Sequence, residues 1–434
     1  MNLETTKRNY LFVSSSALHI DCARKIVKEG HEVRYWIESE SEKNTGDGFV
    51  PKVEKWEPHV DWADIIVFDD VEGHGTKADA LRKKGKLVIG GTPYTDRLED
   101  DRSFGQDELK KAGISILNYK EFTNFDDAIT FVKENPRKYV IKPSGEAQNI
   151  KRLLFVGVED DGSDVVRVLE AYKRVWSDTI KVFQLQNRVT GVEVGVGAFF
   201  NGHKFLEPIN INFEHKKLFP GDIGPATGEM GTSMFWSKSN RLFNATLKKM
   251  ESKLAEEGYV GYIDLNCIVN SQGIYPLEFT ARFGYPTIQI QSDGLAMSLA
   301  DFFYNLASGD DQDIKVKKGF QVGVRLVVPP YPFGDKKTFD TYSKDATIVF
   351  KKPIYDGVHI EDVKLVNNEW LVTGSAGVAL VVSGQGSTMR EAQKQAYSRI
   401  QNILIPNMYY RKDIGDRWYE DSDKLHTWGY LREN

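Results

Sequence analysis

The sequence predicts a multidomain protein of the α/β and α+β classes. The chain has 434 residues and 41% hydrophobic content, which is enough for several cores. Strands alternate with helices near the N-terminus, and short strands dominate near the C-terminus. We predict an N-terminal parallel α/β domain over residues 1–100, a two-lobed α+β core over 101–318 and a C-terminal β-rich domain over 319–434. A lid lobe is expected within the core, over about 120–187.

The N-terminal domain is predicted from an apolar strand over residues 10–14 and a helix over 17–29. Apolar residues recur in this helix at the spacing of one helical face, and Gly30 is a common type of C-terminal stop. Strands that alternate with helices in this way form a parallel, doubly wound sheet. The other predicted elements of this domain are strands over 31–37, 64–68 and 86–89 and a helix over 76–84.

The first half of the core contains a strand over residues 139–143, which carries Lys142 and ends at a Ser144-Gly145 turn. Asn201-Gly202, a strong hairpin signal, joins predicted strands over 192–200 and 204–211. The remaining predictions in this region are helices over 104–112, 126–133 and 165–175, strands over 153–156 and 181–185, and an extended segment over 115–117.

The second half of the core begins with a glycine-rich loop predicted over residues 217–239. A long amphipathic helix is predicted over 241–257, and a hairpin over 259–269 and 273–279. A helix over 295–307 completes the core. The C-terminal domain is predicted from strands over 320–328, 347–350, 363–366, 370–373 and 378–383 and a helix over 388–402.

The composition narrows the functional classes. A net charge of −5 and a pI near 6.0 argue against a dedicated nucleic-acid-binding protein, which usually carries a basic excess. Two cysteines, Cys22 and Cys267, are too few for a disulfide scaffold and fit buried thiols in a reducing compartment. No apolar run approaches the ~20 residues of a membrane span, and no signal-peptide pattern is present. We therefore expect a cytoplasmic protein.

Two carboxylates mark the hairpin near the end of the core. Asp264 and Glu278 lie on its two strands, and two carboxylates at one edge cannot both stay ionised and unpaired without cost. A magnesium ion removes this repulsion, because Mg²⁺ binds one or two carboxylates together with phosphate oxygens. On these two residues alone, a pair of solvated acidic side chains is an equal alternative.

Three further features suit phosphate chemistry. Lys142 ends an apolar strand, although a surface lysine with a buried stem is the simpler interpretation of that residue alone. Residues 221–231 include four glycines, which allow the backbone to approach a ligand closely. Arg282 lies four residues after Glu278 and could hold a phosphate or carboxylate through two N–H groups. Taken alone, such an arginine is more often part of a structural ion pair.

Together these features resemble the glycinamide ribonucleotide synthetase family of ATP-grasp ligases, also called phosphoribosylamine–glycine ligases. Residues 278–289, EFTARFGYPTIQ, are similar to the family's EFNxRFGDPExQ. Residues 222–231, DIGPATGEMG, resemble its DxGPNTGGMG, and residues 214–217, EHKK, resemble its DHKR. Residues 410–417, YRKDIGDR, match its closing RKDIGxR. The resemblance covers nearly the whole chain and is weakest over the first 100 residues.

The resemblance implies a fold and a reaction. The N-terminal domain would be a Rossmann-like pre-ATP-grasp domain, and the core would be an ATP-grasp domain. The family joins phosphoribosylamine to glycine in purine biosynthesis, converting ATP to ADP and phosphate. The glycine carboxylate is first activated as an acyl phosphate, which the amine then attacks. ATP with Mg²⁺, or with Mn²⁺, is the implied cofactor set, and small molecules are the implied partners.

Matched position by position, the resemblance also implies site residues. Nucleotide binding would involve the backbone of the strand over 183–186 as an adenine hinge and the residues Arg102, Lys142, Gln184, Leu185, Gln186 and Glu193. The acceptor and the transferred phosphate would be lined by Lys216, Asp222 and Arg282. The metal ligands would be Asp264, Glu278 and Thr280, with Asp264 included because ATP-grasp enzymes generally place an acidic ligand there.

Several positions depart from the family pattern. The glycine-rich loop expected after the first strand reads SSSALH at residues 14–19, and a second such loop reads SGEAQNIK at 144–151. Ala226 and Thr280 each replace an asparagine, and Tyr285 replaces an aspartate. A neutral hydroxyl binds Mg²⁺ less well than an amide carbonyl does. The ATP-binding half of the site is therefore better supported than the acceptor half.

Three functions remain open on the sequence alone. The first is phosphoribosylamine–glycine ligase, and the second is an ATP-grasp ligase for a different amine or carboxylate. The third is a non-catalytic nucleotide-binding homologue. Turnover with another amine would favour the second, and ATP binding without turnover would favour the third. We expect no nucleic-acid or membrane partner, and either a monomer or a homodimer.

Overall fold

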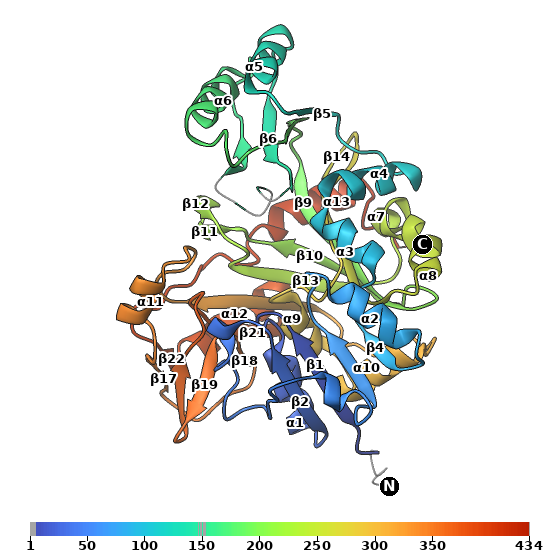
Figure 1. Ribbon diagram of the computed structural model, residues 1–434, viewed down its shortest axis with the longest axis vertical. Coiled ribbons are helices and arrows are strands. Elements are labelled where there is room, and N and C mark those ends of the chain that lie inside the picture. Colours follow the sequence, from blue (N-terminus) through green and yellow to red (C-terminus); the bar gives the residue numbers. More distant parts are fainter. Residues whose placement is uncertain (1–5, 146, 148–149, 151–152, 434) are drawn as a thin grey trace.

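The computed structural model describes residues 6–145, 147, 150 and 153–433. The chain forms a broad body, from which a smaller lid lobe projects at one end (Figure 1). Over the part of the chain described, no helix has both the length and the apolar character that a membrane crossing requires. The predicted mixture of α/β and α+β architecture is confirmed.

The N-terminal segment forms a four-stranded parallel sheet in the order β2-β1-β3-β4. Its elements are β1 (Asn9–Ser14), α1 (Ile20–Lys28), β2 (Glu32–Ile37), β3 (Ile65–Phe68), α2 (His74–Arg82) and β4 (Leu87–Ile89). Helix α1 begins later than predicted because Ala17 has φ = 63°, a left-handed conformation that no right-handed helix contains. A helix that we did not predict, α3 (Pro93–Asp100), follows, and Thr92 forms a capping box at its start.

An eight-stranded antiparallel sheet forms the centre of the body, in the order β15-β14-β9-β10-β13-β16-β21-β18. Its strands are β9 (Val192–Asn201), β10 (Ile209–Glu214), β13 (Gly231–Ser237), β14 (Val260–Asn270), β15 (Gly273–Thr280), β16 (Phe320–Val327), β18 (Val358–Ile360) and β21 (Val378–Gly386). Segments 192–280 and 320–386 therefore share one sheet. The loop predicted over 217–239 is wrong, because β13 lies between β10 and β16 in this sheet.

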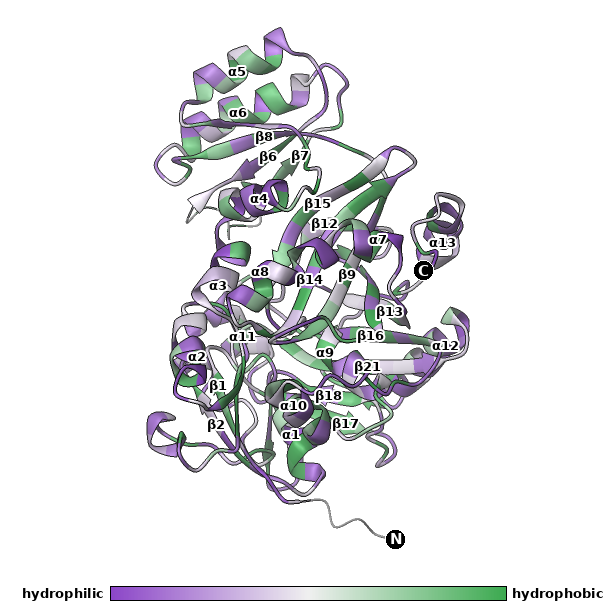
Figure 2. Ribbon diagram, turned by 90° about the vertical axis from the view of Figure 1, so that its right-hand side faces the viewer, coloured by the Kyte–Doolittle hydropathy of each residue, from purple (hydrophilic) through white to green (hydrophobic). Residues whose placement is uncertain are grey.

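The lid has a four-stranded antiparallel sheet in the order β5-β8-β6-β7. Its elements are β5 (Tyr119–Phe122), α5 (Phe125–Glu134), β6 (Tyr139–Pro143), β7 (Phe155–Val156), α6 (Ser163–Val175) and β8 (Phe183–Asn187). Helices α5 and α6 alternate apolar and polar residues along their length (Figure 2), and their apolar sides join one buried cluster with the sheet. The extended segment predicted over 115–117 lies outside this sheet, in which pairing begins at Tyr119.

The long helix predicted over 241–257 is interrupted. Thr246 adopts φ = −127° and ψ = −99°, outside the helical region, and its hydroxyl donates to the Leu242 carbonyl at 2.6 Å. A 3₁₀ turn over Leu247–Met250 separates the two helical pieces.

The remaining elements are α4 (Arg102–Lys111), β11 (Lys217–Phe219), β12 (Ile223–Ala226), α7 (Arg241–Ala245), α8 (Glu251–Glu256), α9 (Thr287–Gly294), α10 (Leu299–Ser308), α11 (Lys336–Tyr342), β17 (Thr347–Phe350), β19 (Val363–Val366), β20 (Glu369–Val372), α12 (Met389–Ile400), β22 (Ile403–Leu404) and α13 (Trp418–Thr427).

A buried ionic cluster joins three distant segments of the body. His359 of β18 contacts Asp21 of α1 through Nδ1 at 2.7 Å and Asp293 of α9 through Nε2 at 2.9 Å. Burial would lower the pKa of His359, but the two carboxylates outweigh it and raise this pKa to about 9. The imidazolium therefore ties the N-terminal, central and C-terminal segments together.

Candidate active site

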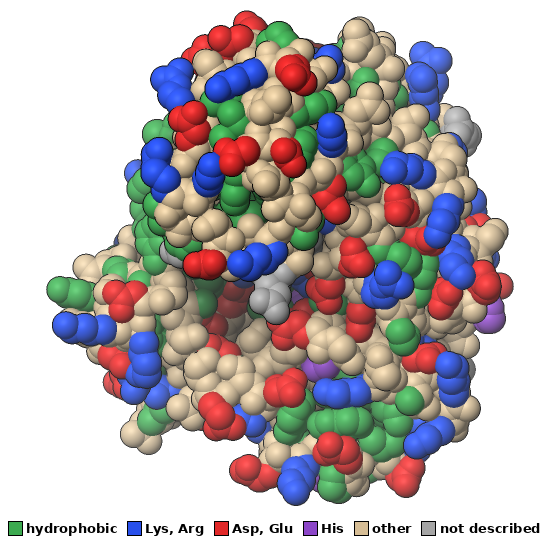
Figure 3. Space-filling view, turned by 45° about the horizontal axis from the view of Figure 1, so that its top comes forward, with side chains coloured by type: hydrophobic (Ala, Val, Ile, Leu, Met, Phe, Trp, Pro, Cys, Tyr) green, Lys and Arg blue, Asp and Glu red, His purple; other side chains and the backbone are tan. Residues whose placement is uncertain are grey.

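The candidate site lies where the lid faces the edge of the central sheet. Lys142 of β6 is directly opposite Gln184 of β8, and Gln186 lies two residues further along, so the three side chains share one face of the lid sheet. Leu185 points to the opposite face, into the lid core. In the space-filling view, acidic side chains gather around a hollow below the lid (Figure 3).

The interior position of β8 bears on the expected adenine hinge. The strand is paired with β5 on one side and with β6 on the other, so the backbone groups of Gln184 and Leu185 are used within the sheet. The Gln184 Oε1 and Gln186 Nε2 atoms are buried and have no hydrogen-bond partner among the described residues. A nucleotide contact at this strand is therefore better served by these two side chains than by the backbone of Leu185.

Two cations approach the site from the lid and from the start of α4. Lys142 is only 8% exposed, and its burial, together with nearby Arg102, lowers its pKa to about 8. The Arg102 guanidinium donates to the Pro143 carbonyl at 2.6 Å, which fixes it beside the strand that carries Lys142. Two neighbouring cations repel each other, and the charge of Glu278 offsets this only in part, so the pair is suited to hold a phosphate.

Lys216 is the centre of the site on the body side. Its Nζ lies 3.0 Å from Glu278, 3.1 Å from Glu214 and 3.4 Å from Glu193. Removal from water would lower the pKa of Lys216, but the three carboxylates outweigh it and raise this pKa well above its ordinary value. Asn266 also donates to Glu193 at 2.9 Å. The structure thus brings together Glu193, Lys216 and Glu278 from three parts of the sequence.

The hairpin β14–β15 places four polar residues on one face. Across the strands, Asp264 pairs with Thr280, and Asn266 pairs with Glu278. The residue directly opposite Glu278 is therefore Asn266, which the sequence analysis did not select. Knowledge of the strand register would have identified it, because residues at i and i+2 share a face.

Asp264 lies deeper than Glu278. It is 5% exposed, and its Oδ2 accepts hydrogen bonds from Asn212 at 2.6 Å and Tyr262 at 3.0 Å. Burial, and next the charge of Glu214, raises the pKa of Asp264 to about 7. This environment favours a residue that supports the site from below over one that contacts the metal first.

The donor set fits magnesium bound together with a nucleotide. Within the described residues, no three His, Cys, Asp or Glu side chains are grouped closely enough to hold a metal alone. Mg²⁺ in nucleotide sites needs only one or two carboxylates, because phosphates and water complete its shell. Glu278 provides a carboxylate, and Asn266, whose amide nitrogen binds Glu193, retains a carbonyl oxygen on the same face.

Arg282 faces the N-terminal domain. Its guanidinium lies 3.0 Å from Glu99 at the end of α3 and 3.6 Å from Asp70 after β3, and it stacks on the ring of Tyr285 at 4.8 Å. Burial would lower the pKa of Arg282, but Glu99 and its other neighbours raise it. At the place expected for the acceptor substrate, the Arg282 cation is therefore flanked by two carboxylates.

Asp222 does not join the Lys216 group. Its carboxylate accepts from Arg411 at 2.8 Å, and Arg411 is 1% exposed and also binds Asp413. The sequence motif at 410–417 therefore anchors the glycine-rich segment 221–231 to the C-terminal part of the chain. The expected role of Asp222 at the transferred phosphate stays a prediction.

One buried acid in the glycine-rich segment was also missed. Glu229 precedes β13 and is 5% exposed; burial, and next the charge of Glu214, raises its pKa well above its ordinary value. Its backbone carbonyl accepts from Tyr331 at 3.0 Å and from Arg325 at 3.3 Å. Residues 146, 148–149 and 151, in the expected loop over 144–151, lie outside the described residues.

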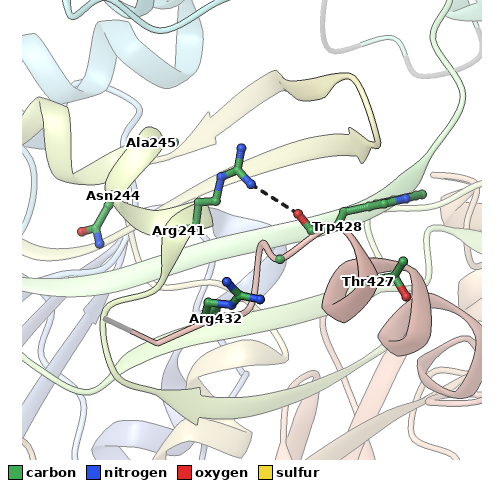
Figure 4. Close-up of a pocket in the computed structure, with 7 residues that line it drawn as sticks. Arg241, Asn244, Ala245, Thr427, Trp428 and Arg432 are labelled. Carbon is green, nitrogen blue, oxygen red and sulfur yellow. Dashed lines mark hydrogen bonds between the residues drawn. The ribbon is translucent and has the colours of Figure 1, made fainter.

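A separate surface pocket lies beside the C-terminus and contains none of the expected site residues. Figure 4 shows Arg241 and Arg432 at this pocket, with Arg241 donating to the Trp428 carbonyl at 3.3 Å. Asn244, Ala245, Thr427 and Gly429 complete its lining. Its position makes it unrelated to the Lys216 group.

Two family models match the chain. The ATP-grasp (A) domain of phosphoribosylglycinamide synthetase matches residues 100–288, and the C domain of the same protein matches residues 321–417. A phosphoribosylamine–glycine ligase from Halalkalibacterium halodurans is 26% identical over 353 residues, covering 78% of each chain.

Solved structures show the same architecture. The phosphoribosylamine–glycine ligase from Thermotoga maritima superposes with a TM-score of 0.68 at 21% identity, covering 94% of this chain and 100% of that one. A biotin carboxylase from Campylobacter jejuni, solved as a β,γ-ATP complex, has a TM-score of 0.59 at 14% identity and covers 98% of both chains. At these identities the structural likeness concerns the fold.

Proposed function

Because the chain belongs to the phosphoribosylglycinamide synthetase family, we propose that it joins phosphoribosylamine to glycine and converts ATP to ADP and phosphate. Family membership makes it an ATP-grasp ligase that forms a carbon–nitrogen bond. The observation that carries the proposal is the meeting of Lys142 from the lid with Lys216 and Glu278 from the central sheet. The charges of Lys216 and Glu278 both affect the pKa of Lys142, so the three side chains lie around the same part of the site.

The first step requires the ATP phosphates to be held and their charge offset. An oxygen of the glycine carboxylate attacks the γ-phosphorus, the bond to the β-phosphate oxygen breaks, and ADP leaves with the electron pair. Lys142, Arg102 and Lys216 are the cations placed to stabilise the phosphate oxygens. A magnesium ion at Glu278 and the Asn266 carbonyl oxygen would add positive charge to the same oxygens.

The second step forms the amide. The amine nitrogen attacks the acyl carbon, the bond to the phosphate oxygen breaks, phosphate leaves with the electron pair, and the nitrogen loses a proton. An acyl phosphate is hydrolysed readily, so water must be excluded while the amine enters. The lid, which carries Lys142, is the element suited to close over the bound nucleotide.

The test is ADP release from Mg·ATP with glycine, measured with and without freshly prepared phosphoribosylamine. We expect turnover only when both substrates are present, and amide product in equal amount to ADP. A protein that binds Mg·ATP but does not turn over phosphoribosylamine would refute this acceptor. A Lys216→Met variant should be inactive, whereas Lys138→Met, on the outer part of the lid, should retain activity.

A second acceptor class is favoured by the charges around Arg282. Asp70 and Glu99 both accompany this arginine. Burial, and next the charge of Asp70, raises the pKa values of the nearby carboxyl groups of Glu72 and Asp100. Such surroundings repel a phosphate group and favour an amine that lacks one. Turnover with an unphosphorylated amine, in an assay where phosphoribosylamine gives none, would establish this alternative.

A further inference from the structure

Glu229 occupies a rigid position between the two halves of the candidate site. The loop that carries it is tied to the Lys216 side, because the Met230 amide donates to the His215 carbonyl at 2.8 Å and the Thr227 amide donates to the Lys216 carbonyl at 2.8 Å. On the other side, the Arg325 amide donates to the Met230 carbonyl at 3.0 Å. The backbone around Glu229 is therefore fixed at once by the segment that follows β10 and by β16.

The carboxyl group of Glu229 is buried without a hydrogen-bond partner at Oε1 among the described residues. Its nearest cation does not satisfy it, since Arg325 directs Nη2 to Glu361 at 2.7 Å and Nη1 to the Glu229 backbone carbonyl. A buried, unpaired carboxyl oxygen destabilises the free protein. The simplest explanation for a carboxyl group at this position is a ligand that provides the missing hydrogen-bond donor.

The neighbours of Glu229 place its carboxyl group between the phosphate side and the acceptor side. The charges of Glu214, Lys216 and Asp264 all affect the pKa of this carboxyl group. On the acceptor side, a Cβ atom built on adjacent Gly228 would lie 3.9 Å from Tyr285. The guanidinium groups of Arg282 and Arg325 both stack on the Tyr285 ring. The loop that carries Glu229 thus adjoins both the phosphate side and the acceptor side, and with them the place where an amine must approach an acyl phosphate.

We propose that the Glu229 carboxyl group binds the amino nitrogen of the acceptor substrate and holds it against the acyl phosphate. This inference rests on the proposed function and adds a named recognition residue to it. The unpaired oxygen has no hydrogen-bond donor beside it, and an amine brings two or three N–H groups that can donate to it. The position departs from the family pattern DxGPNTGGMG, which has glycine where this sequence has Glu229.

The test uses hydroxylamine as a small amine probe and phosphoribosylamine as the larger one. With Mg·ATP and glycine, attack of hydroxylamine on the acyl phosphate yields a hydroxamate that is measured by colour. We expect Glu229→Gln to lower kcat/KM for both amines at least tenfold, with the KM values for ATP and glycine changed less than twofold. The matched control is Glu42→Gln, which alters another buried glutamate with an unpaired oxygen, Oε2, far from the site.

Each result separates the two proposals. Unchanged kcat/KM for hydroxylamine in Glu229→Gln overturns this inference alone, since the wild-type protein still activates glycine. A raised KM for glycine with normal amine kinetics also overturns it, because the carboxyl group would then serve the other substrate. If the wild-type protein yields neither hydroxamate nor the amide of phosphoribosylamine, the proposed function is overturned, and this inference with it. If Glu229→Gln does not fold, Glu229→Asp, which withdraws the carboxyl group by one methylene, is measured with the same criteria.

Discussion

Replacing Lys142 by methionine should stabilise the free protein while it abolishes ATP use. The lysine is 8% exposed, and burial with the nearby Arg102 lowers its pKa from 10.5 to about 8. At about 1.4 kcal/mol per pKa unit, the charged form is destabilised by roughly 3 kcal/mol in the folded state. At pH 7 the group is charged in both the folded and the unfolded chain, so the whole of this penalty applies.

The pH dependence has a defined sign. As pH rises from about 8 toward 10.5, the folded protein loses this proton before the unfolded chain does, and the penalty disappears. The difference in unfolding temperature between Lys142→Met and wild type should therefore be positive by a few degrees at pH 7. It should shrink toward zero by pH 10.

The assay is thermal unfolding from pH 6.5 to 10, with and without Mg·ATP. The nucleotide should raise the unfolding temperature of the wild type but not that of Lys142→Met. Lys138→Met is the control, because Lys138 is 37% exposed and pairs with exposed Asp160, a contact of about 0–1 kcal/mol. Equal or lower stability of Lys142→Met at pH 7, or a difference that does not change with pH, would refute the reasoning.

Three further predictions concern the metal site and the buried histidine. Glu278→Ala should lower kcat by at least about a hundredfold with little change in unfolding temperature, since the side chain is 48% exposed; retained activity at ordinary magnesium concentration would contradict its role. Thr280→Asn should lower the half-saturating concentration of Mg²⁺ in the ADP-release assay, and an unchanged value would show that this position does not meet the metal. His359→Gln should lower the free energy of unfolding by about 3 kcal/mol at pH 6, because the pKa of the folded group is about 9 and its stabilisation is complete below 6.5. This deficit should narrow as pH rises through 9, and a deficit that does not vary with pH would contradict the ionic account.

The elements that the sequence predicted well are those in which one local pattern dominates. The hairpin β14–β15 was predicted from two apolar strands and a polar turn, and the carboxylates Asp264 and Glu278 lie on it as expected. Lys142 also ends an apolar strand as predicted. The exact pairing of the strands depends on a register shift between Asn266 and Cys267, which no local pattern reveals, so Asn266 was overlooked.

The misplaced elements have a different cause. Strand β13 follows a segment whose glycines suggested a loop, and it is held in place by β10 and β16, far away in sequence. The contact between Lys216 and Glu278 spans 62 residues, and that between Asp222 and Arg411 spans 189. Such pairings are decided by tertiary packing, which overrides local preference.

The shared central sheet has a consequence for synthesis on the ribosome. Strand β13 ends at Ser237, whereas its neighbour β16 begins only at Phe320. At about 5–20 residues per second, the nascent chain exposes one unpaired strand edge for several seconds before its partner emerges. Open edges of this kind recruit other chains. Expression of a fragment that ends before β16 would make that transient state permanent, and aggregation is then the expected fate.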